Sequence, residues 1–198
     1  KPQGVTSNKA LQRVKAIFFA QKAGHTGSLD PLATGMLPIC FGEATKVSNY
    51  LLDANKRYRF TCQLGVVTAT GDAEGDVIEQ HQVPELDDAA IEAVLQQFRG
   101  TIEQVPPMYS ALKHKGEPLY KLARRGEPVQ KPPRRIRIDA LDILDVDLPQ
   151  ISFEVACSAG TYVRTLCSDI GDELERIGAH VAGKYPATRA TLDNAQGK

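Results

Sequence analysis

The chain has 198 residues, 42% of them hydrophobic, and its 24 Lys and Arg balance 24 Asp and Glu. This length and apolar content suffice for one domain, or for one large and one small domain. No apolar run is long enough to cross a bilayer and no signal-peptide pattern occurs, so we expect a cytoplasmic protein. The cysteines have no CxxC or Cys/His metal spacing, and we expect no metal and buried free thiols at Cys40, Cys62, Cys157 and Cys167.

The charges are unevenly distributed along the chain. Residues 1–29 contain five Lys/Arg and no acid, and residues 113–137 contain nine Lys/Arg against two acids. Residues 60–98 contain eight acids and no Lys/Arg. A polyanion responds to a local positive face and not to the net charge, so a nucleic-acid partner stays open. Chance clustering on a solvated surface is the alternative, and the acidic stretch is expected to face away from any RNA.

Apolar residues recur at helical spacing after an opening segment that reads Lys1-Pro2-x-Gly4-x-x-Ser7. The spacing predicts a helix over residues 7–22 whose polar side is left for solvent or for RNA. Its apolar face consists of Ala10, Leu11, Val14, Ile17 and Phe18.

Residues 24–46 are rich in glycine and proline and contain one acid, Asp30, before Glu43. Glycine allows backbone conformations that other residues resist, and Asp30 precedes a proline, which holds it extended. A carboxylate on such a loop is suited to being aimed at a substrate, whereas a plain Asp-Pro surface turn is the alternative. The stretch has no P-loop and no dinucleotide fingerprint.

The remaining elements follow from hydrophobic period. Alternation predicts a strand over residues 56–66, followed by a turn-rich connection over 65–75. Acids Asp139, Asp142, Asp145 and Asp147 are expected on the outer positions of a strand and its turn. Further elements are predicted as helices over 45–52, 87–98 and 118–125, a hairpin of strands over 136–146 and 151–157, and a last helix that begins within 158–165.

Four stretches together resemble one family. The run Gly24-His-Thr-Gly-Ser-Leu-Asp-Pro-Leu-Ala-Thr-Gly35, continued by Gly42-Glu-Ala-Thr-Lys46, resembles the catalytic motif of the TruB family of pseudouridine synthases, which isomerise a uridine in the T-loop of tRNA. The opening segment, the run Lys56-Arg-Tyr-Arg59 and the run Gly160-Thr-Tyr-Val-Arg-Thr165 resemble its other motifs. The resemblance covers nearly the whole chain, and its details are closer to the bacterial stand-alone branch than to guide-RNA-dependent relatives.

The resemblance implies an α+β pseudouridine synthase fold: a mixed, mostly antiparallel sheet with flanking helices and a central catalytic cleft. It implies no cofactor, because the reaction has no redox change and no net hydrolysis. Asp30 would act as the nucleophile, and attack on the sugar C1′, attack on the base and assistance of elimination at the sugar are the open alternatives for its role. Tyr58 would stack on the flipped uracil and help to remove its C5 proton, and Arg164 would pair with Asp30.

Arg164 also attracts attention on physical grounds. An arginine near a helix start is electrostatically unfavourable, and a carboxylate partner would offset that cost. Asp30 is the candidate, and a surface ion pair with Asp169 is the alternative.

The resemblance also implies residues that bind the substrate. His25 would fill the space left by the flipped base, with a purely structural histidine as the alternative, and Lys46 and Tyr162 would serve orientation and packing. Residues 109–135 would form a basic insertion that grips the tRNA T-arm, and Tyr109 and Tyr120 suit contact with nucleotides. Its grip is assigned to Lys121, Arg124 and Arg125.

The domain expectation is a catalytic domain over 1–181, with 182–198 as its end or as the start of a truncated C-terminal region. Three features of the family are missing from this sequence. They are the strand that normally precedes the opening segment, the Leu-Arg-Arg segment that normally follows residues 178–181, and the C-terminal PUA domain. We interpret the Leu-Arg-Arg gap as an omitted mobile loop, with true loss as the alternative.

A monomer is expected. The alternative to an enzyme is an inactive RNA-binding module or tRNA-folding chaperone, but such a binder would need none of Asp30, Tyr58 and Arg164.

Overall fold

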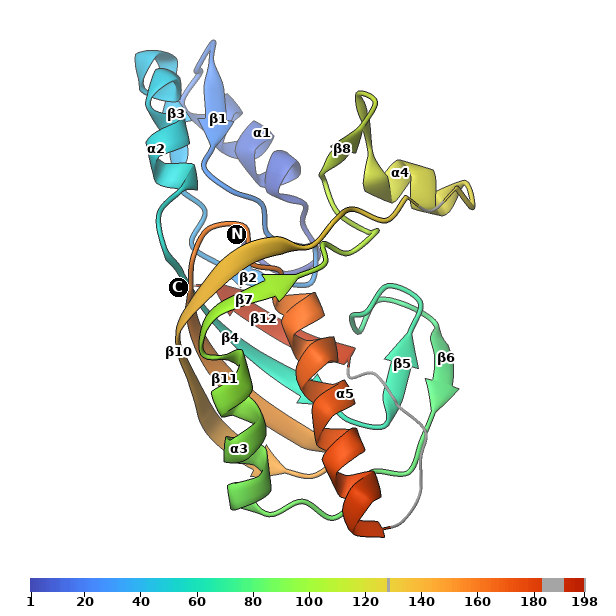
Figure 1. Ribbon diagram of the computed structural model, residues 1–198. Coiled ribbons are helices and arrows are strands. Elements are labelled where there is room, and N and C mark those ends of the chain that lie inside the picture. The colour runs from blue at the N-terminus through green and yellow to red at the C-terminus, as the bar shows by residue number, and fades with distance from the viewer. Residues whose placement is uncertain (128, 183–190, 198) are drawn as a thin grey trace.

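A six-stranded β-sheet forms the centre of the molecule (Figure 1). The computed structural model describes residues 1–127, 129–182 and 191–197. The strand order is β2-β12-β4-β11-β10-β7, and the pairs are antiparallel except for β2 with β12. This confirms the predicted mixed, mostly antiparallel sheet. The strands are β2 (Thr34–Gly35), β12 (Thr191–Gly197), β4 (Lys56–Gln63), β11 (Gln150–Cys157), β10 (Arg134–Asp147) and β7 (Gly100–Gln104).

Two helices, α3 (Asp88–Phe98) and α5 (Val163–Ala182), lie side by side over one face of the sheet (Figure 1). Helix α3 begins as predicted, because the Asp87 side chain accepts a hydrogen bond from the Ala90 amide at 2.7 Å and caps it. Its predicted inner residues are buried in the core, with Phe98 partly buried. None of the helices in the described residues is long and apolar enough to cross a membrane.

The alternating pattern of β4 decides which of its side chains face the helices. Phe60 is 2% exposed and stacks beside Phe153 of β11, with ring centroids 5.3 Å apart. Burying each phenylalanine contributes about 1.5–3 kcal/mol. On the opposite face, Arg59 pairs with Glu154 of β11 at 2.6 Å, in contact with solvent. The sheet therefore has one apolar face and one polar face, and the acids of β10 lie on exposed positions as predicted.

An upper lobe, residues 7–25 and 39–52, stands beyond one end of the sheet (Figure 1). Helix α1 ends five residues earlier than predicted, because Phe19 adopts a left-handed φ of 48° and the chain turns. The predicted apolar face is therefore buried only at its beginning, and Ile17 and Phe18 are 70% and 67% exposed. The lobe contains α1 (Ser7–Ile17), β1 (Ala23–His25), β3 (Ile39–Phe41), the 3-10 helix η1 (Gly42–Lys46) and α2 (Ser48–Leu52).

A small arm projects beside the upper lobe (Figure 1). It consists of the hairpin β8 (Lys113–His114) and β9 (Glu117–Pro118), followed by α4 (Leu119–Arg124). The short helix predicted over 118–125 is confirmed. The core of the arm is apolar, because Leu119 and Leu122 are 2% and 8% exposed, which leaves its charged side chains facing outwards.

The strand predicted over 56–66 is interrupted. Strand β4 ends at Gln63, and Gly65 turns the chain with a φ of 73°. The predicted turn-rich connection contains β5 (Val66–Thr68), which pairs with β6 (Val77–Gln80). Strands β7 and β12 were not predicted. The proposed Leu-Arg-Arg gap falls at residues 182–186, and 183–186 lie outside the described residues.

The cysteines differ from the expectation of four free thiols. Cys62 on β4 and Cys167 on α5 are paired as a disulfide, with Cα atoms 5.9 Å apart. The pair is separated by 105 positions and meets because α5 packs on β4, which the spacing of cysteines along the chain does not reveal. Cys40 and Cys157 are free and buried, as predicted.

Candidate active site

Asp30 lies on an irregular loop, residues 26–33, between β1 and β2. The main chain turns just after it, since the Ala33 amide donates to the Asp30 carbonyl at 3.1 Å. The Asp30 side chain is 43% exposed, so a substrate can reach its carboxylate. The predicted placement on a shaped loop, outside any regular element, is confirmed.

Arg164 is the second residue of α5 and holds the Asp30 carboxylate side-on. Its Nε lies 2.9 Å from one Asp30 oxygen, and its Nη2 lies 3.5 Å from the other. The guanidinium is only 8% exposed, so this pair is shielded from solvent on the arginine side. The predicted Asp30–Arg164 pair is confirmed, and the alternative of a surface ion pair with Asp169 is wrong, because the guanidinium points into the site.

A second carboxylate, Asp72, lies on the other side of the guanidinium. Its oxygen is 3.4 Å from Arg164 Nη1, and its side chain is 6% exposed. The Thr70 hydroxyl and the Glu74 amide donate to Asp72 at 2.6 and 3.1 Å, which fixes its orientation. Sequence reasoning missed Asp72 and placed its acidic stretch away from the RNA. The orientation of that stretch relative to RNA stays a prediction, and the signal available for Asp72 was an acid directly after Gly71 in a tight turn.

Two carbonyl groups complete the coordination of the guanidinium. Arg164 donates to the Thr70 carbonyl at 3.1 Å and to the Tyr109 carbonyl at 2.7 Å. Asp30, the 70–72 turn and the start of the basic insertion therefore meet at one side chain. A planar guanidinium with several fixed partners has little freedom to rotate, so it orients the Asp30 carboxylate.

The environment of Asp30 changes its acidity. Partial burial raises the pKa of the Asp30 carboxyl above its usual value, and Arg164 opposes that shift. The neighbouring Asp72 charge adds to the increase, because two carboxylates near one another disfavour ionisation of both. A less stabilised carboxylate is the better nucleophile, and Arg164 fixes the direction in which it points.

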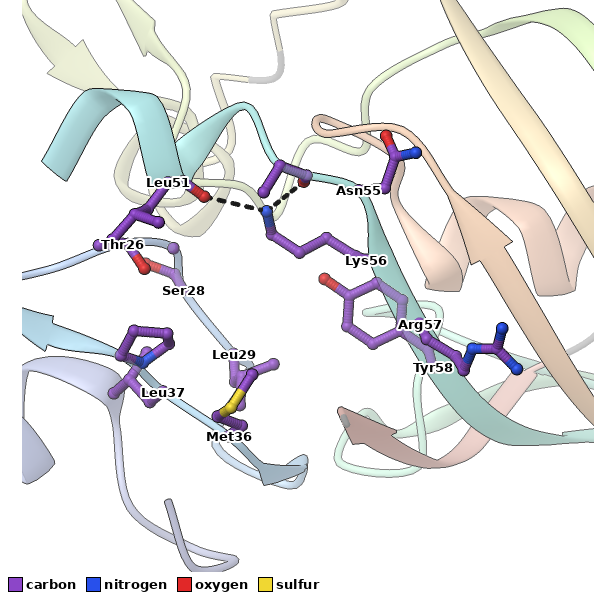
Figure 2. A pocket seen from close by; sticks show the side chains of 13 residues that line it. Thr26, Ser28, Leu29, Met36, Leu37, Leu51, Asn55, Lys56, Arg57 and Tyr58 are labelled. Carbon is purple, nitrogen blue, oxygen red and sulfur yellow. Dashed lines mark hydrogen bonds between the residues drawn. The ribbon is translucent and has the colours of Figure 1, made fainter.

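A pocket of about 200 Å³ opens beside Tyr58 (Figure 2). Figure 2 shows the Tyr58 ring on one side of it, and Leu29 and Met36 on the other. Burial raises the pKa of the Tyr58 hydroxyl to about 12, with smaller contributions from Cys157 and Asp30. The hydroxyl is therefore protonated at neutral pH. The apolar lining and the aromatic wall suit a flat ring such as a nucleobase.

The other residues predicted to bind substrate lie around this centre. His25 ends β1 one residue before Thr26 of the pocket lining, and its Nδ1 is buried with no hydrogen-bond partner in the described residues. Lys46 lies farther out in the upper lobe, 69% exposed and paired with Glu43. The Tyr162 ring is covered by the Arg134 guanidinium, 4.8 Å from the ring centroid.

The three predicted gripping residues lie on the arm but differ in their partners. Lys121 and Arg124 are exposed on α4, and Arg124 lies 5.7 Å from the centroid of the Tyr120 ring. Arg125 is held by Glu117 at 2.5 Å and by Glu127 at 3.4 Å. Its charge is thus largely balanced within the arm.

The geometry of an aspartate on a shaped loop, an arginine at a helix start and a tyrosine on a neighbouring strand agrees with the family comparison. Residues 15–163 match the family described as "TruB family pseudouridylate synthase (N terminal domain)". The chain belongs to the TruB family of pseudouridylate synthases.

Its curated relatives carry one name. The tRNA pseudouridine synthase B of Chromohalobacter salexigens is 59% identical over 181 residues, which cover 91% of this chain and 59% of that protein. The protein of the same name from Stutzerimonas stutzeri is 59% identical over 182 residues, covering 92% and 59%. The chain thus spans about 59% of the length of these bacterial relatives.

Solved structures share the fold. The "Crystal Structure of a Cbf5-Nop10-Gar1 Complex" contains a chain 27% identical to this one, with a TM-score of 0.67 over 100% of this chain and 46% of that chain. The "Structure of H/ACA RNP bound to a substrate RNA containing 2'-deoxyuridine" matches at 24% identity, with a TM-score of 0.63 over 100% and 44%.

Proposed function

We propose that this protein isomerises a uridine in the T-loop of tRNA to pseudouridine. The observation that carries the proposal is the buried Arg164, which holds Asp30 side-on beside the pocket that contains Tyr58. A protein that only binds RNA has no need of an accessible carboxylate oriented by a buried arginine, because that carboxylate repels phosphate. The family match and the name tRNA pseudouridine synthase B of its relatives agree with this activity.

The reaction leaves the composition and the oxidation state of the substrate unchanged. The bond between uracil N1 and the ribose C1′ breaks, the base rotates, and a bond forms between C5 and C1′. The proton on C5 leaves, and N1 gains a proton from solvent. Because the target base is stacked in a folded RNA, it must be extruded into a pocket before this chemistry begins.

Asp30 acts as the nucleophile in this proposal, which divides one difficult step into two easier ones. Arg164 keeps the carboxylate aimed while its charge changes during the reaction. Asp72 holds the guanidinium from the other side. The position of Arg164 is therefore not set by its attraction to Asp30 alone.

Tyr58 forms the aromatic wall against which the uracil stacks. Its hydroxyl has a pKa of about 12, so it begins the reaction protonated and donates a hydrogen bond. The hydroxyl can therefore remove the C5 proton only after it has lost its own proton. Otherwise a separate base, oriented by the hydroxyl, removes it. The stacking role is independent of that proton transfer.

The RNA is bound by the basic surfaces on either side. The upper lobe contains five cations and one acid, Glu43, and the arm presents Lys121 and Arg124. We assign binding of the tRNA T-arm to these surfaces and the catalytic unit to residues 1–181. We further propose that the protein is a monomer in the cytoplasm, where tRNA is present.

Tritium release tests the proposal directly. An unmodified tRNA transcript carrying ³H at uridine C5 loses its label when C5 bonds to C1′. We expect wild-type protein to release one equivalent per tRNA, and a transcript with cytidine at the target position to release none. Tight tRNA binding without release would instead favour an RNA-binding or folding role.

A further inference from the structure

Ser7, the first residue of α1, contacts the catalytic loop through its side chain. It is 5% exposed. Its hydroxyl accepts a hydrogen bond from the Leu29 amide at 2.9 Å and donates one to the Leu29 carbonyl at 3.1 Å. A single side chain thus pairs with both main-chain groups of the residue before Asp30. Beyond Asp30, the Gly4 amide donates to the Pro31 carbonyl at 2.8 Å, so the main chain is held on both sides of the carboxylate.

Gln104, the last residue of β7, makes the same kind of contact with the other half of the ion pair. It is 1% exposed. Its Oε1 accepts from the Tyr162 amide at 2.8 Å, and its Nε2 donates to the Tyr162 carbonyl at 3.1 Å. Tyr162 lies two residues before Arg164, where the chain turns into α5. The amide of Gln104 therefore fixes the point from which Arg164 projects.

The two contacts act on segments that lie outside helices and strands, the loop over 26–33 and the segment over 158–162. Tyr162 also accepts the first hydrogen bond of α5, from the Leu166 amide at 3.0 Å, and Gln104 adds two further contacts to that residue. Two simultaneous hydrogen bonds to one residue fix its peptide planes as well as its place. A displacement of about 1 Å in a reacting group costs on the order of 100-fold in rate.

We propose that Ser7 and Gln104 are positioning residues that set the geometry of the Asp30–Arg164 pair, one from each side. This inference rests on the proposed function. Neither side chain is assigned any contact with the substrate. Their effect is on the rate of the chemical step and not on the binding of tRNA.

Ser7→Ala and Gln104→Met each replace a buried polar side chain with an apolar one. Both substitutions therefore remove the hydrogen bonds and keep the position filled. We expect each variant to lower the single-turnover rate of tritium release by about 10- to 100-fold. The Kd for tRNA should stay within about twofold of wild type, because the binding surfaces are unchanged. Glu103→Gln is a matched control at an exposed position next to Gln104 and should keep the wild-type rate. Ser7→Thr keeps the hydroxyl and should recover most of the rate.

A double-mutant cycle separates positioning from loss of stability. Arg164→Lys loses the side-on geometry, and by itself it should be severely impaired. In that background Ser7→Ala and Gln104→Met should slow the residual reaction less than about twofold, because the geometry they protect is already lost. Their effect on the melting temperature should be the same in both backgrounds.

The outcomes are distinct. Rates that fall in the wild-type background but not with Arg164→Lys support positioning. Equal losses in both backgrounds, losses that follow the unfolded fraction, or wild-type rates in both variants overturn it. A wild-type protein that releases no tritium refutes the proposed function itself, whereas active wild type with fully active variants refutes only the positioning roles.

Discussion

Arg164 is the residue on which the site converges. It is nearly buried, and it contacts Asp30, Asp72 and two carbonyl groups. Desolvating a guanidinium is costly unless its donors are satisfied, and these partners satisfy them. The consequence for function is that Asp30, the partner most open to solvent, is left as the group that a substrate meets.

Asp30→Asn should abolish isomerisation and keep tRNA binding. The amide has nearly the same shape but lacks the nucleophilic charge, so we expect single-turnover conversion to fall by more than about 1,000-fold. The Kd for tRNA, measured by filter binding, should change less than about threefold. Conversion near the wild-type rate would remove Asp30 from the nucleophile role.

The raised pKa of Asp30 predicts a pH dependence. The folded protein binds this proton more tightly than the unfolded chain does, so stability from this group falls as pH rises from about 3.8 through the folded pKa. The reaction needs the ionised form, so its rate should rise with pH with a midpoint above that value. A midpoint at or below the usual carboxyl value would contradict the burial argument.

Tyr58→Phe separates stacking from proton transfer. The ring stays, and stacking contributes roughly 1–3 kcal/mol per base with little help from the hydroxyl. We expect near-normal tRNA affinity with a large loss of product, and Tyr58→Ala should lose both. Rapid tritium release by Tyr58→Phe would show that the ring suffices and that another group removes the C5 proton.

At the scale of elements, the arm and the upper lobe lie beyond the same end of the sheet (Figure 1). The arm is anchored at its base, because the Tyr109 carbonyl binds Arg164, and its helix carries the exposed cations. The RNA contact that we propose at α4 would thus be connected to the Asp30–Arg164 pair through a short stretch of chain.

Lys121→Ala with Arg124→Ala should weaken tRNA binding and flatten its salt dependence. Each lost phosphate contact should reduce the slope of log affinity against log salt by about 0.7–0.9. Arg125→Ala is the matched comparison, and its effect should be smaller because Glu117 and Glu127 already balance that charge. An unchanged slope in the double variant would place the grip elsewhere.

The sequence was sufficient for elements with strong local signals. Helix α3 has a capping Asp87 and a clear apolar stripe, and β11 alternates cleanly between buried and less buried positions. Helix α1 was predicted too long, because periodicity alone does not show that Phe18, whose ring lies beside that of Phe41, remains 67% exposed. The sequence did not reveal Asp72, because its contact with Arg164 joins two residues that are 92 positions apart along the chain.

Across the whole molecule, zero net charge conceals two different surfaces. The upper lobe and the arm are rich in cations, whereas Asp139, Asp142, Asp145 and Asp147 are exposed along β10. Such a distribution orients a polyanion towards the end of the sheet where Asp30 lies, and it repels the polyanion from the other face. For the function that we propose, this distribution would guide RNA to the site without an excess of positive charge.

The most direct test of the account is to map pseudouridine in unmodified tRNA after incubation with the wild-type protein and with Asp30→Asn. Carbodiimide labelling followed by primer extension locates each product residue. The account predicts one new pseudouridine, in the T-loop, with the wild-type protein and none with the variant. No product despite bound tRNA, product outside the T-loop, or product with Asp30→Asn would contradict it.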